Sequence, residues 1–191
     1  MRKRICIFCG SNTGTQVTFV EAATKLAADI AIADMELVYG GGRVGLMGVI
    51  ADAALALGGR VIGVMPESLI EREVAHQNLS ELIVVSSMHE RKAVMESLSD
   101  AFIALPGGFG TLDEFFEILT WAQLGIHQKP CGMLNIDGYF DHIVGFMNLA
   151  VSAGFVHERH RDMVVVSRNV DELLPQLLDP CRSVESKWSL V

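Results

Sequence analysis

Residues 105–117, LPGGFGTLDEFFE, place a run of glycines directly before three carboxylates, Asp113, Glu114 and Glu117. Glycine lets the backbone approach a ligand closely, and the start of a helix adds positive charge, so this loop suits an anion. Carboxylates repel an anion but stabilise a cation that forms during a reaction. A ribose 5′-phosphate attached to a base meets both demands, because its phosphate is anionic and cleavage of its glycosidic bond makes C1′ cationic. The stretch therefore predicts a site for such a ligand, with Glu114 facing the ribose.

The same carboxylates also have a purely structural interpretation. Thr111 and Glu114 have the T-x-x-E spacing of a capping box, in which each side chain satisfies an amide at the start of a helix. Asp113 and Glu117 would be favoured in the first turns of that helix by its dipole. The local pattern leaves both interpretations open.

A pair of basic residues follows another apolar run. In SSMHERK, residues 86–92, Ser87 and Glu90 are spaced as a second capping box, which places Arg91 and Lys92 in the first turns of a helix. Positive charge there opposes the helix dipole, so another interaction is expected to favour it. We expect the pair to lie beside the glycine loops. A solvated surface position is the alternative.

Two further glycine-rich segments follow apolar runs, CGSNTG at residues 9–14 and YGGGRVGLMG at residues 39–48. Ligands of open parallel sheets bind where the carboxyl ends of strands meet helix N-termini, so these loops should share one edge of the sheet. We expect phosphate contacts in the loops at Gly10, Ser11, Gly41, Gly42 and Gly107. Residues 40–45 also match G-x-G-x-x-G, with Glu67 about 20 residues further on, so a dinucleotide site is an alternative.

The elements that must position these residues follow from an alternation of short apolar runs with helical patterns, which indicates β-α-β units. Because the runs are apolar on both faces, they predict parallel strands covered by helices on each side. The predicted strands are residues 4–9, 36–40, 60–65, 82–87, 101–106, 129–136 and 162–167. Helices are predicted to begin near Thr18, Val44, His89, Thr111, Tyr139 and Val170, with a loop-like segment at 67–79. We predict one α/β domain over residues 1–180, with a sheet of about seven strands, and a poorly ordered tail at 181–191.

Composition excludes some classes of protein. The formal net charge of −8 argues against a general affinity for nucleic acid or for an anionic membrane. The apolar segment at the N-terminus is too short for a signal peptide, and no run approaches the ~18 apolar residues of a membrane span, so we expect a cytoplasmic protein. Four cysteines fit a reducing compartment. Cys6 and Cys9 would point to opposite faces of a strand, so no metal site is predicted.

The motif PGGFGTLDE resembles the P-G-G-x-G-T-x-x-E signature of the LONELY GUY family, the cytokinin riboside 5′-monophosphate phosphoribohydrolases, which were long misnamed lysine decarboxylases. Further motifs resemble the same family, and the resemblance extends from Ile5 to about Val166. These motifs are CIFCGS, YGGGRVGLMG, GVMPESL, MHERK and TWAQLGIHQKP.

This resemblance implies that Arg91 and Glu114 form a catalytic pair. It implies a Rossmann-like domain, a homodimer, and hydrolysis of a nucleoside 5′-monophosphate to free base and ribose 5-phosphate, with no cofactor. Phe109 stands where many relatives have tyrosine, and Asp113 where many have glutamate, so the preferred base is open between adenine and N6-prenylated adenine. The ligand-binding positions that it implies are Glu73, Lys92, Gly108, Phe109, Gly110, Thr111 and Thr120.

Other classes stay open at this point. A non-catalytic carrier of a nucleotide or of the molybdenum cofactor would need the phosphate loop but has no use for Arg91 and Glu114. A dinucleotide oxidoreductase would leave the loop at 106–111 without a role. Lysine decarboxylation would need pyridoxal phosphate on a lysine, and Lys92 is the only candidate near the loops, so it is disfavoured. An apolar dimer interface, with core packing as the alternative, is suggested by Trp121, Leu124 and Ile126.

Overall fold

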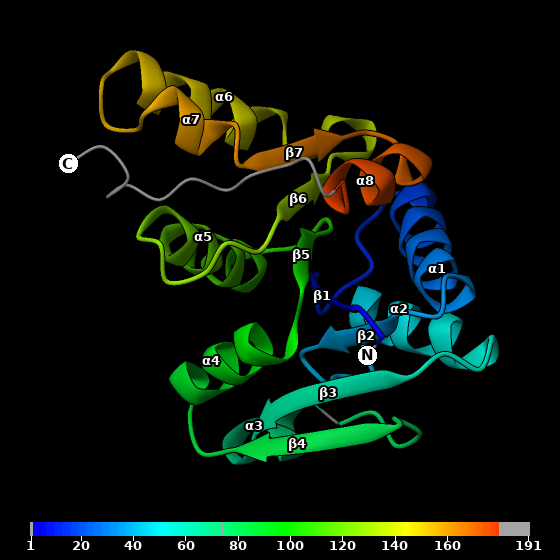
Figure 1. The fold of residues 1–191 in the computed structure, drawn as a ribbon. Coiled ribbons are helices and arrows are strands. Elements are labelled where there is room, and N and C mark those ends of the chain that lie inside the picture. The colour runs from blue at the N-terminus through cyan, green and yellow to red at the C-terminus, as the bar shows by residue number, and fades with distance from the viewer. Residues whose placement is uncertain (1, 74, 180–191) are drawn as a thin grey trace.

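The computed structural model describes residues 2–73 and 75–179, apart from the side chains of residues 71–73. Within that part, seven parallel strands form one sheet in the order β4-β3-β2-β1-β5-β6-β7 (Figure 1). Each strand overlaps one of the predicted apolar runs, so the predicted α/β fold with a parallel sheet is confirmed. The predicted tail, residues 181–191, lies outside the described residues. The strands are β1 (Arg4–Phe8), β2 (Glu36–Tyr39), β3 (Val61–Pro66), β4 (Glu81–Val85), β5 (Ala101–Ala104), β6 (Cys131–Leu134) and β7 (Val164–Ser167).

Helices connect the strands, and every predicted helix begins within two residues of its expected start. They are α1 (Val17–Ile32), α2 (Gly45–Ala56), α3 (Glu67–Glu73), α4 (Met88–Leu98), α5 (Phe109–Gln123), α6 (Asp141–Ser152), α7 (Glu158–Arg161) and α8 (Val170–Leu177), with a 3₁₀ turn η1 (Ile136–Gly138) before α6. Across the described residues, none of these helices combines the length and apolarity that crossing a membrane requires.

The expectation of a loop-like or irregular segment at 67–79 was wrong for its first part, because α3 occupies residues 67–73, whereas residues 75–79 contain no helix or named strand. Glu67 places a negative charge in the first turn of α3, where the helix dipole favours it. A helix of seven residues makes only about two turns, which is too short for a 3.6-residue periodicity to stand out in the sequence.

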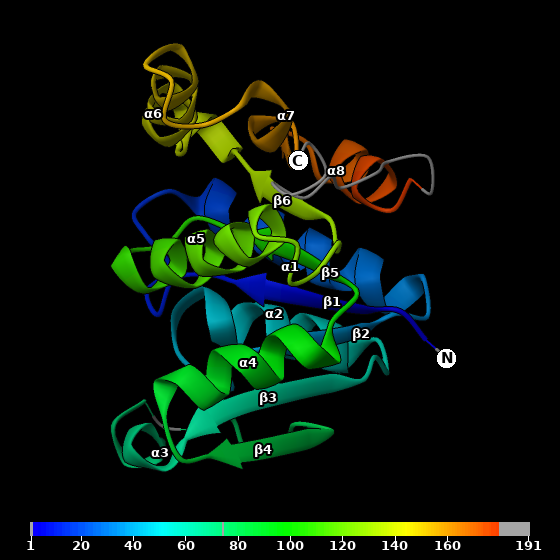
Figure 2. The same cartoon turned by 60° about the vertical axis from the view of Figure 1, so that its left-hand side comes forward.

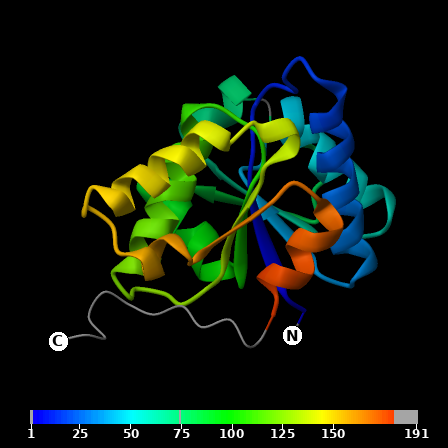
Figure 3. The same ribbon diagram turned by 90° about the horizontal axis from the view of Figure 1, so that it is seen from above.

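The sheet separates two apolar cores, because successive side chains of a strand point to opposite faces. On β1, Ile5 and Ile7 pack with α1, α2 and α8, whereas Cys6 and Phe8 pack with α4, α5 and α6. Figure 2 shows α4 and α5 on one side of the sheet and α1 and α2 on the other. Figure 3, seen from above, shows α6 in yellow beside α5 and α8 in orange-red beside α1 in blue. Cys9 belongs to the first core and Cys6 to the second, so the two thiols point to opposite faces as predicted.

The order of the strands reverses at the centre of the sheet. β1 pairs with β2 on one side and with β5 on the other, so the loops after β1 and β5 leave the sheet next to each other. In open α/β sheets the crevice at such a reversal, beside the carboxyl ends of the strands, is where ligands bind. Topology therefore places the glycine loops at 9–14 and 106–111 at this crevice.

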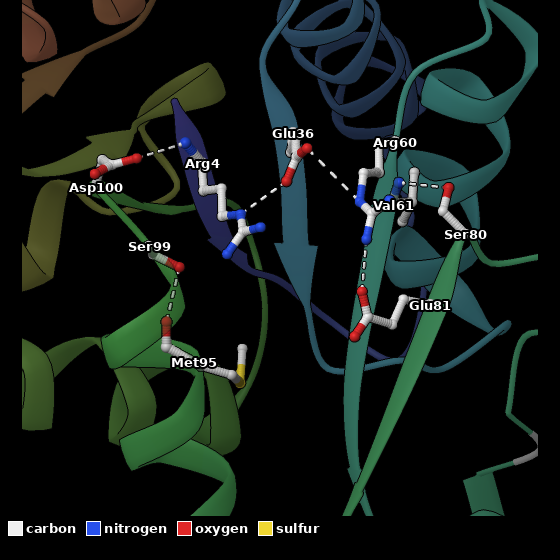
Figure 4. A network of polar contacts seen from close by, with 9 residues as sticks. All are labelled: Arg4, Glu36, Arg60, Val61, Ser80, Glu81, Met95, Ser99 and Asp100. Atoms are coloured by element: carbon white, nitrogen blue, oxygen red, sulfur yellow. Dashed lines mark hydrogen bonds and ion pairs between the residues drawn. The ribbon is translucent and has the colours of Figure 1, made fainter. Parts of the chain in front are cut away.

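At the opposite, amino-terminal edge of the sheet, charged side chains link neighbouring strands (Figure 4). Arg4 Nε donates to Glu36 Oε2 at 2.7 Å, and Glu36 Oε1 lies 3.6 Å from Arg60 Nε. Arg60 Nη2 in turn donates to Glu81 Oε2 at 2.6 Å, and the amide of Arg4 donates to Asp100 Oδ2 at 2.8 Å. These contacts join the starts of β1, β2, β3 and β4 into a network made from the chain's own charges.

Candidate active site

A pocket of about 240 Å³ opens at the carboxyl ends of β1 and β5, where the strand order reverses. Its walls are residues 10–14 and 106–108 together with Phe19, Leu46 and Tyr139. The amide of Gly10 donates to the carbonyl of Pro106 at 3.0 Å, which joins the two loops. The structure thus brings together four of the residues predicted to bind the ligand, namely Gly10, Ser11, Gly107 and Gly108.

The start of α5 borders this pocket. Gly108 is the N-cap residue and supplies no capping side chain. The amides of Phe109, Gly110 and Thr111 are the first of the helix, so they have no acceptor within it. They lie at the positive end of the helix dipole, where an anion is favoured.

The predicted capping box of Thr111 and Glu114 is wrong, because α5 begins two residues earlier than its pattern suggested. With Gly108 as N-cap, Thr111 is the third residue of the helix and Glu114 lies nearly one turn further along. Thr111 and Glu114 are both buried, and the Thr111 side chain fills the space where a Cβ of Gly107 would lie. Glu114 is therefore directed into the protein and does not cap the helix.

The second predicted capping box, at the start of α4, is confirmed in part. Ser87 is the N-cap residue, and its hydroxyl accepts a hydrogen bond from the amide of Glu90 at 3.2 Å. The carboxylate of Glu90 instead accepts from the amide and hydroxyl of Ser86, at 2.7 and 2.6 Å. Arg91 and Lys92 then follow in the first turns of α4, as predicted.

The predicted catalytic pair is assembled by α4 and α5. Arg91 Nη1 lies 3.3 Å from Glu114 Oε1, and the two residues are only 6% and 8% exposed. Arg91 Nε also donates to the carbonyl of Val64 on β3 at 3.0 Å. Buried charges require such partners, because removing one partner of a buried pair costs about 3–5 kcal/mol. The pair is therefore held in one geometry over the carboxyl ends of the strands.

Gly40, which follows β2, leaves room for the side chain of Arg91 because it has no Cβ. A Cβ at Gly40 would overlap the Arg91 guanidinium, so a residue with a side chain would displace it. The loop is fixed in turn by the amide of His76, which donates to the carbonyl of Gly41 at 3.0 Å. Two residues predicted to contact phosphate lie in this loop beside the arginine rather than along the pocket, namely Gly41 and Gly42.

The G-x-G-x-x-G match at residues 40–45 does not leave an open anion site. The backbone of Ser11 fills the space where a Cβ of Gly45 would lie, and the amide of Leu46 donates to the carbonyl of Gly10 at 3.0 Å. The start of α2, where the pyrophosphate of a dinucleotide would bind, is thus covered by the loop after β1. This packing weakens the dinucleotide alternative.

Lys92 forms ion pairs with the other two carboxylates near the start of α5, those of Asp113 and Glu117. Its Nζ lies 3.2 Å from Asp113 Oδ2 and 2.5 Å from Glu117 Oε2. Burial lowers the pKa of Lys92, but hydrogen bonds to Glu117 and Asp113 outweigh burial, and the net shift is upward. The side chain is therefore an ammonium ion and not the neutral amine that a pyridoxal phosphate Schiff base requires. Together with Arg91 it neutralises the carboxylates beside the glycine loop, so they do not repel an anion bound there.

Cys9, the residue after β1, lies close enough to Arg91 and Glu114 for their charges to affect its pKa. Burial raises the pKa of its thiol well above the usual range, the Glu114 carboxylate raises it further, and Arg91 opposes this shift. The thiol is therefore neutral and unsuited to act as a nucleophile. Among the described residues, no group of three or more histidine, cysteine or carboxylate side chains is placed to hold a metal ion.

Of the seven ligand-binding positions that the family resemblance implies, only Gly108 lines the pocket, and neither Arg91 nor Glu114 lines it. The positions that do not line it are Glu73, Lys92, Phe109, Gly110, Thr111 and Thr120. Thr120 lies nearly two turns beyond Glu114, and its hydroxyl donates to the carbonyl of Phe116 at 2.7 Å. It faces a separate groove between α5 and α6. Phe109 is 94% exposed at the start of α5. Glu73 is the last residue of α3, and its side chain lies outside the described part of the chain.

The sequence patterns missed the aromatic wall of the pocket. Tyr139 and Phe19 line it, and their rings meet edge to face with centroids 5.4 Å apart. Tyr139 follows β6 and η1, and so it comes from the same edge of the sheet as the glycine loops. The sequence held a signal for Tyr139, because DGYF at residues 137–140 directly follows an apolar run. Side chains that follow parallel strands lie at the carboxyl-terminal edge of the sheet, where ligands bind.

Comparison with known proteins bears on the family and the fold of this chain. Residues 47–177 match the family model described as "Possible lysine decarboxylase". The chain is 49% identical over 177 residues to the cytokinin riboside 5′-monophosphate phosphoribohydrolase LOG2 of Arabidopsis thaliana, covering 93% of this chain and 83% of that protein. It is 47% identical over 175 residues to the phosphoribohydrolase LOG of Oryza sativa subsp. japonica, covering 92% of this chain and 72% of that protein.

Among solved structures, the molybdenum cofactor binding protein from the phototrophic bacterium Rippkaea orientalis is similar, with a TM-score of 0.68 and 23% identity. The match covers 90% of this chain and 92% of that one, and it shows a shared fold. The parallel sheet with a pocket at its strand reversal places the protein among the Rossmann-like α/β proteins. The identity to the plant proteins places it more narrowly. The chain belongs to the LONELY GUY family, which confirms the resemblance seen in its motifs.

Proposed function

We propose that the protein hydrolyses the N-glycosidic bond of a purine riboside 5′-monophosphate, releasing the free base and ribose 5-phosphate. The observation that carries this proposal is the buried pair of Arg91 and Glu114, whose Nη1 and Oε1 atoms lie 3.3 Å apart. The pair does not line the pocket walled by the glycine loops, but Glu114 belongs to α5, whose N-cap residue Gly108 does. Family membership supports it, because relatives about half identical over most of the chain are named as cytokinin riboside 5′-monophosphate phosphoribohydrolases.

The proposed roles follow from charge and position. Amides at the start of α5 and in the loop after β1 hold the 5′-phosphate, because they are donors at a positive helix end. Glu114 lies nearly one helical turn beyond Thr111, the last of these amides. It orients a water or stabilises the oxocarbenium character at C1′. Arg91 positions the ribose phosphate and balances the charge of Glu114. The oxygen of water bonds to C1′ as the C1′–N bond breaks, and the electron pair and a proton leave with the base.

The first test is to separate the products after incubation with AMP and with isopentenyladenosine monophosphate. We expect free base and ribose 5-phosphate from the wild-type protein, and a loss of about 10²–10³-fold in rate in Glu114→Gln. Glu81→Gln, at the amino-terminal edge of the sheet, is the matched control and should keep its rate. The relative rates on the two nucleotides would identify the preferred base.

A non-catalytic carrier is the competing outcome of this test. A carrier binds its ligand without turnover and has no use for a buried Arg91 and Glu114 pair. If AMP binds to the wild-type protein in titration calorimetry but no base is released from either nucleotide, hydrolysis is excluded and the carrier takes its place.

We also propose that the protein is a homodimer through the outer face of α5 and α6. Phe146, Leu149 and Phe155 are 60%, 62% and 86% exposed, and Ile126 is 63% exposed. A groove of about 220 Å³ between α5 and α6, which includes Thr120, lies beside them. Exposed apolar side chains gathered in this way are typical of a protein interface. A second copy that covers the groove would bring its own residues near Thr120.

Sedimentation velocity tests the dimer. We expect a mass about twice that of the 20.8 kDa chain, and a monomer for Leu149→Glu, because a charge cannot be buried unpaired in an apolar interface. Glu21→Gln on the exposed side of α1 is the control. A wild-type protein that sediments as a monomer at micromolar concentration would contradict the proposal.

A cytoplasmic location is the third part of the proposal. Cys6 and Cys9 are buried free thiols, which fit a reducing compartment. Fractionation of cells that express the tagged protein should recover it with cytosolic markers, and recovery from a secreted fraction would contradict this.

A further inference from the structure

The hydroxyl of Tyr139 donates to the carbonyl of Gly107 at 2.6 Å. This contact ties the turn after β6 to the glycine loop after β5, and both residues line the pocket. The tyrosine ring packs edge to face against Phe19, at 5.4 Å between centroids, and against Phe140, at 5.0 Å. Two neighbouring rings therefore fix the direction in which the hydroxyl points.

The peptide that receives this hydrogen bond lies between two glycines, Gly107 and Gly108. Neither has a Cβ, so rotation of this peptide plane meets little steric resistance. Gly107 itself is fixed by close packing against Thr111 and Gly10. No neighbouring atom lies within 4 Å of the place where a Cβ of Gly108 would be. On the Gly108 side, packing does little to restrain the peptide.

Fixing the carbonyl also fixes an amide. A trans peptide is planar, so the carbonyl of Gly107 and the N–H of Gly108 point in opposite directions. The hydrogen bond from Tyr139 therefore keeps the Gly108 amide directed away from the tyrosine, and it keeps the Gly107 carbonyl occupied. Rotation of this peptide would exchange a donor for an acceptor next to the first amides of α5.

We infer that Tyr139 is a positioning residue for the phosphate of the ligand, acting through the peptide between Gly107 and Gly108. The inference rests on the proposed function, which assigns the phosphate to the amides at the start of α5. With the hydroxyl present, the loop presents amides to the anion. Without it, the peptide rotates and brings a carbonyl oxygen toward the phosphate, which is repulsive.

The test is Tyr139→Phe, which removes the hydroxyl and keeps the ring that packs against Phe19. In titration calorimetry with ribose 5-phosphate, we expect Kd to rise about fivefold, as for the loss of one hydrogen bond. Kd for adenosine, which has no phosphate, should change by less than about twofold, within the usual scatter of such measurements. An unchanged Kd for ribose 5-phosphate, or an equal loss for both ligands, would overturn the inference.

Thr18→Val is the matched control for loosening of the same turn. Thr18 donates to Asp137 Oδ2 at 2.6 Å and so anchors the turn to α1 without touching Gly107. We expect this variant to bind ribose 5-phosphate as the wild type does, and a loss equal to that of Tyr139→Phe would also overturn the inference.

Measuring binding and turnover separately distinguishes a failure of the positioning role of Tyr139 from a failure of the proposed hydrolysis. If ribose 5-phosphate binding depends on Tyr139 but neither nucleotide is cleaved, hydrolysis fails and the positioning role stands. If the wild-type protein does not bind ribose 5-phosphate, the positioning role fails, and hydrolysis is decided by the product assay on AMP.

Discussion

The two edges of the sheet use charge in different ways. At the amino-terminal edge, Glu36 lies between Arg4 and Arg60, and each charge is met by a neighbouring strand (Figure 4). At the carboxyl-terminal edge, Arg91 and Glu114 also pair, but they lie under loops whose amides have no acceptor in the helix they begin. The first edge is satisfied within the chain. At the second edge the first amides of α5 have no acceptor in that helix, which is the arrangement that our proposed phosphate site requires.

The helix starts show the same contrast. α4 and α8 are capped by the side chains of Ser87 and Asn169, which accept from first-turn amides. Within the described part of the chain, five other helices, α1, α2, α5, α6 and α7, have no side-chain cap; their N-cap residues are Gln16, Val44, Gly108, Phe140 and His157. The start of α2 is covered by the loop after β1, whereas Gly108, the N-cap residue of α5, lines the pocket and has open space where a Cβ would lie.

The largest effect should come from unpairing the buried charges. Arg91→Ala leaves the Glu114 carboxylate buried without its cation, which should cost about 3–5 kcal/mol of unfolding free energy. Activity should fall by about 10²–10³-fold. Urea denaturation and the product assay measure these two losses.

A double variant separates the stability effect from catalysis. Adding Glu114→Gln to Arg91→Ala removes the buried carboxylate charge, so part of the lost unfolding free energy should return while the rate stays at least as low as that of Arg91→Ala. A double variant no more stable than Arg91→Ala would show that the pair is not a buried ion pair.

The next largest effect is expected at Gly40. In Gly40→Ala the new methyl group would occupy the site of the Arg91 guanidinium, so the arginine must move and the rate should fall by about 10²-fold, as for a misplaced catalytic group. Gly132→Ala on β6 is the matched control, because its methyl group would crowd the flexible ends of the Leu173 and Leu177 side chains and reach the Val165 carbonyl at an ordinary contact distance. Equal rates for the two variants would contradict the placement of Arg91.

A smaller and purely structural effect is expected at the amino-terminal edge. Glu36→Gln removes the carboxylate between Arg4 and Arg60, whose side chains are 28% and 42% exposed, so solvent screens part of the loss. We expect about 1 kcal/mol less stability, a difference that shrinks in high salt, and an unchanged rate. A change in KM for AMP would show that the two edges are coupled.

The smallest effect is a pH dependence of the unfolding free energy, caused by His127, a buried residue away from the pocket. Burial lowers the pKa of His127, which donates from Nε2 to the Ile118 carbonyl at 2.9 Å and accepts at Nδ1 from the amide of Lys129. Below about pH 6.5 the unfolded chain takes up a proton that the folded imidazole resists, so stability should fall as pH drops from there toward the lowered pKa.

His127→Gln tests this dependence. Its unfolding free energy should change less between pH 7 and pH 5 than that of the wild type, whereas His89→Gln, at an exposed position on α4, should behave as the wild type does. The same slope in all three proteins would remove His127 as the cause.

The strands and the main helices could be predicted because their signals are local. Runs such as RICIFC are apolar on both faces, and only a strand between two helical layers buries both. Helix α3 could not be predicted, because its roughly two turns are too short to show the 3.6-residue repeat of apolar positions. The capping box at Thr111 was misplaced because Gly108 can serve as the N-cap, and nothing in the T-x-x-E spacing shows which residue begins the helix.

The sequence by itself determined the class of fold, the three glycine loops, and the residue types that hold and balance charge, because these depend on near neighbours in the chain. Only the tertiary structure decided that Arg91 lies against Gly40, that Lys92 pairs with Asp113 and Glu117, and that Tyr139 holds the glycine loop. These contacts join segments more than twenty residues apart. The packing of helices on the two faces of the sheet sets which of them meet, and no local pattern encodes that packing.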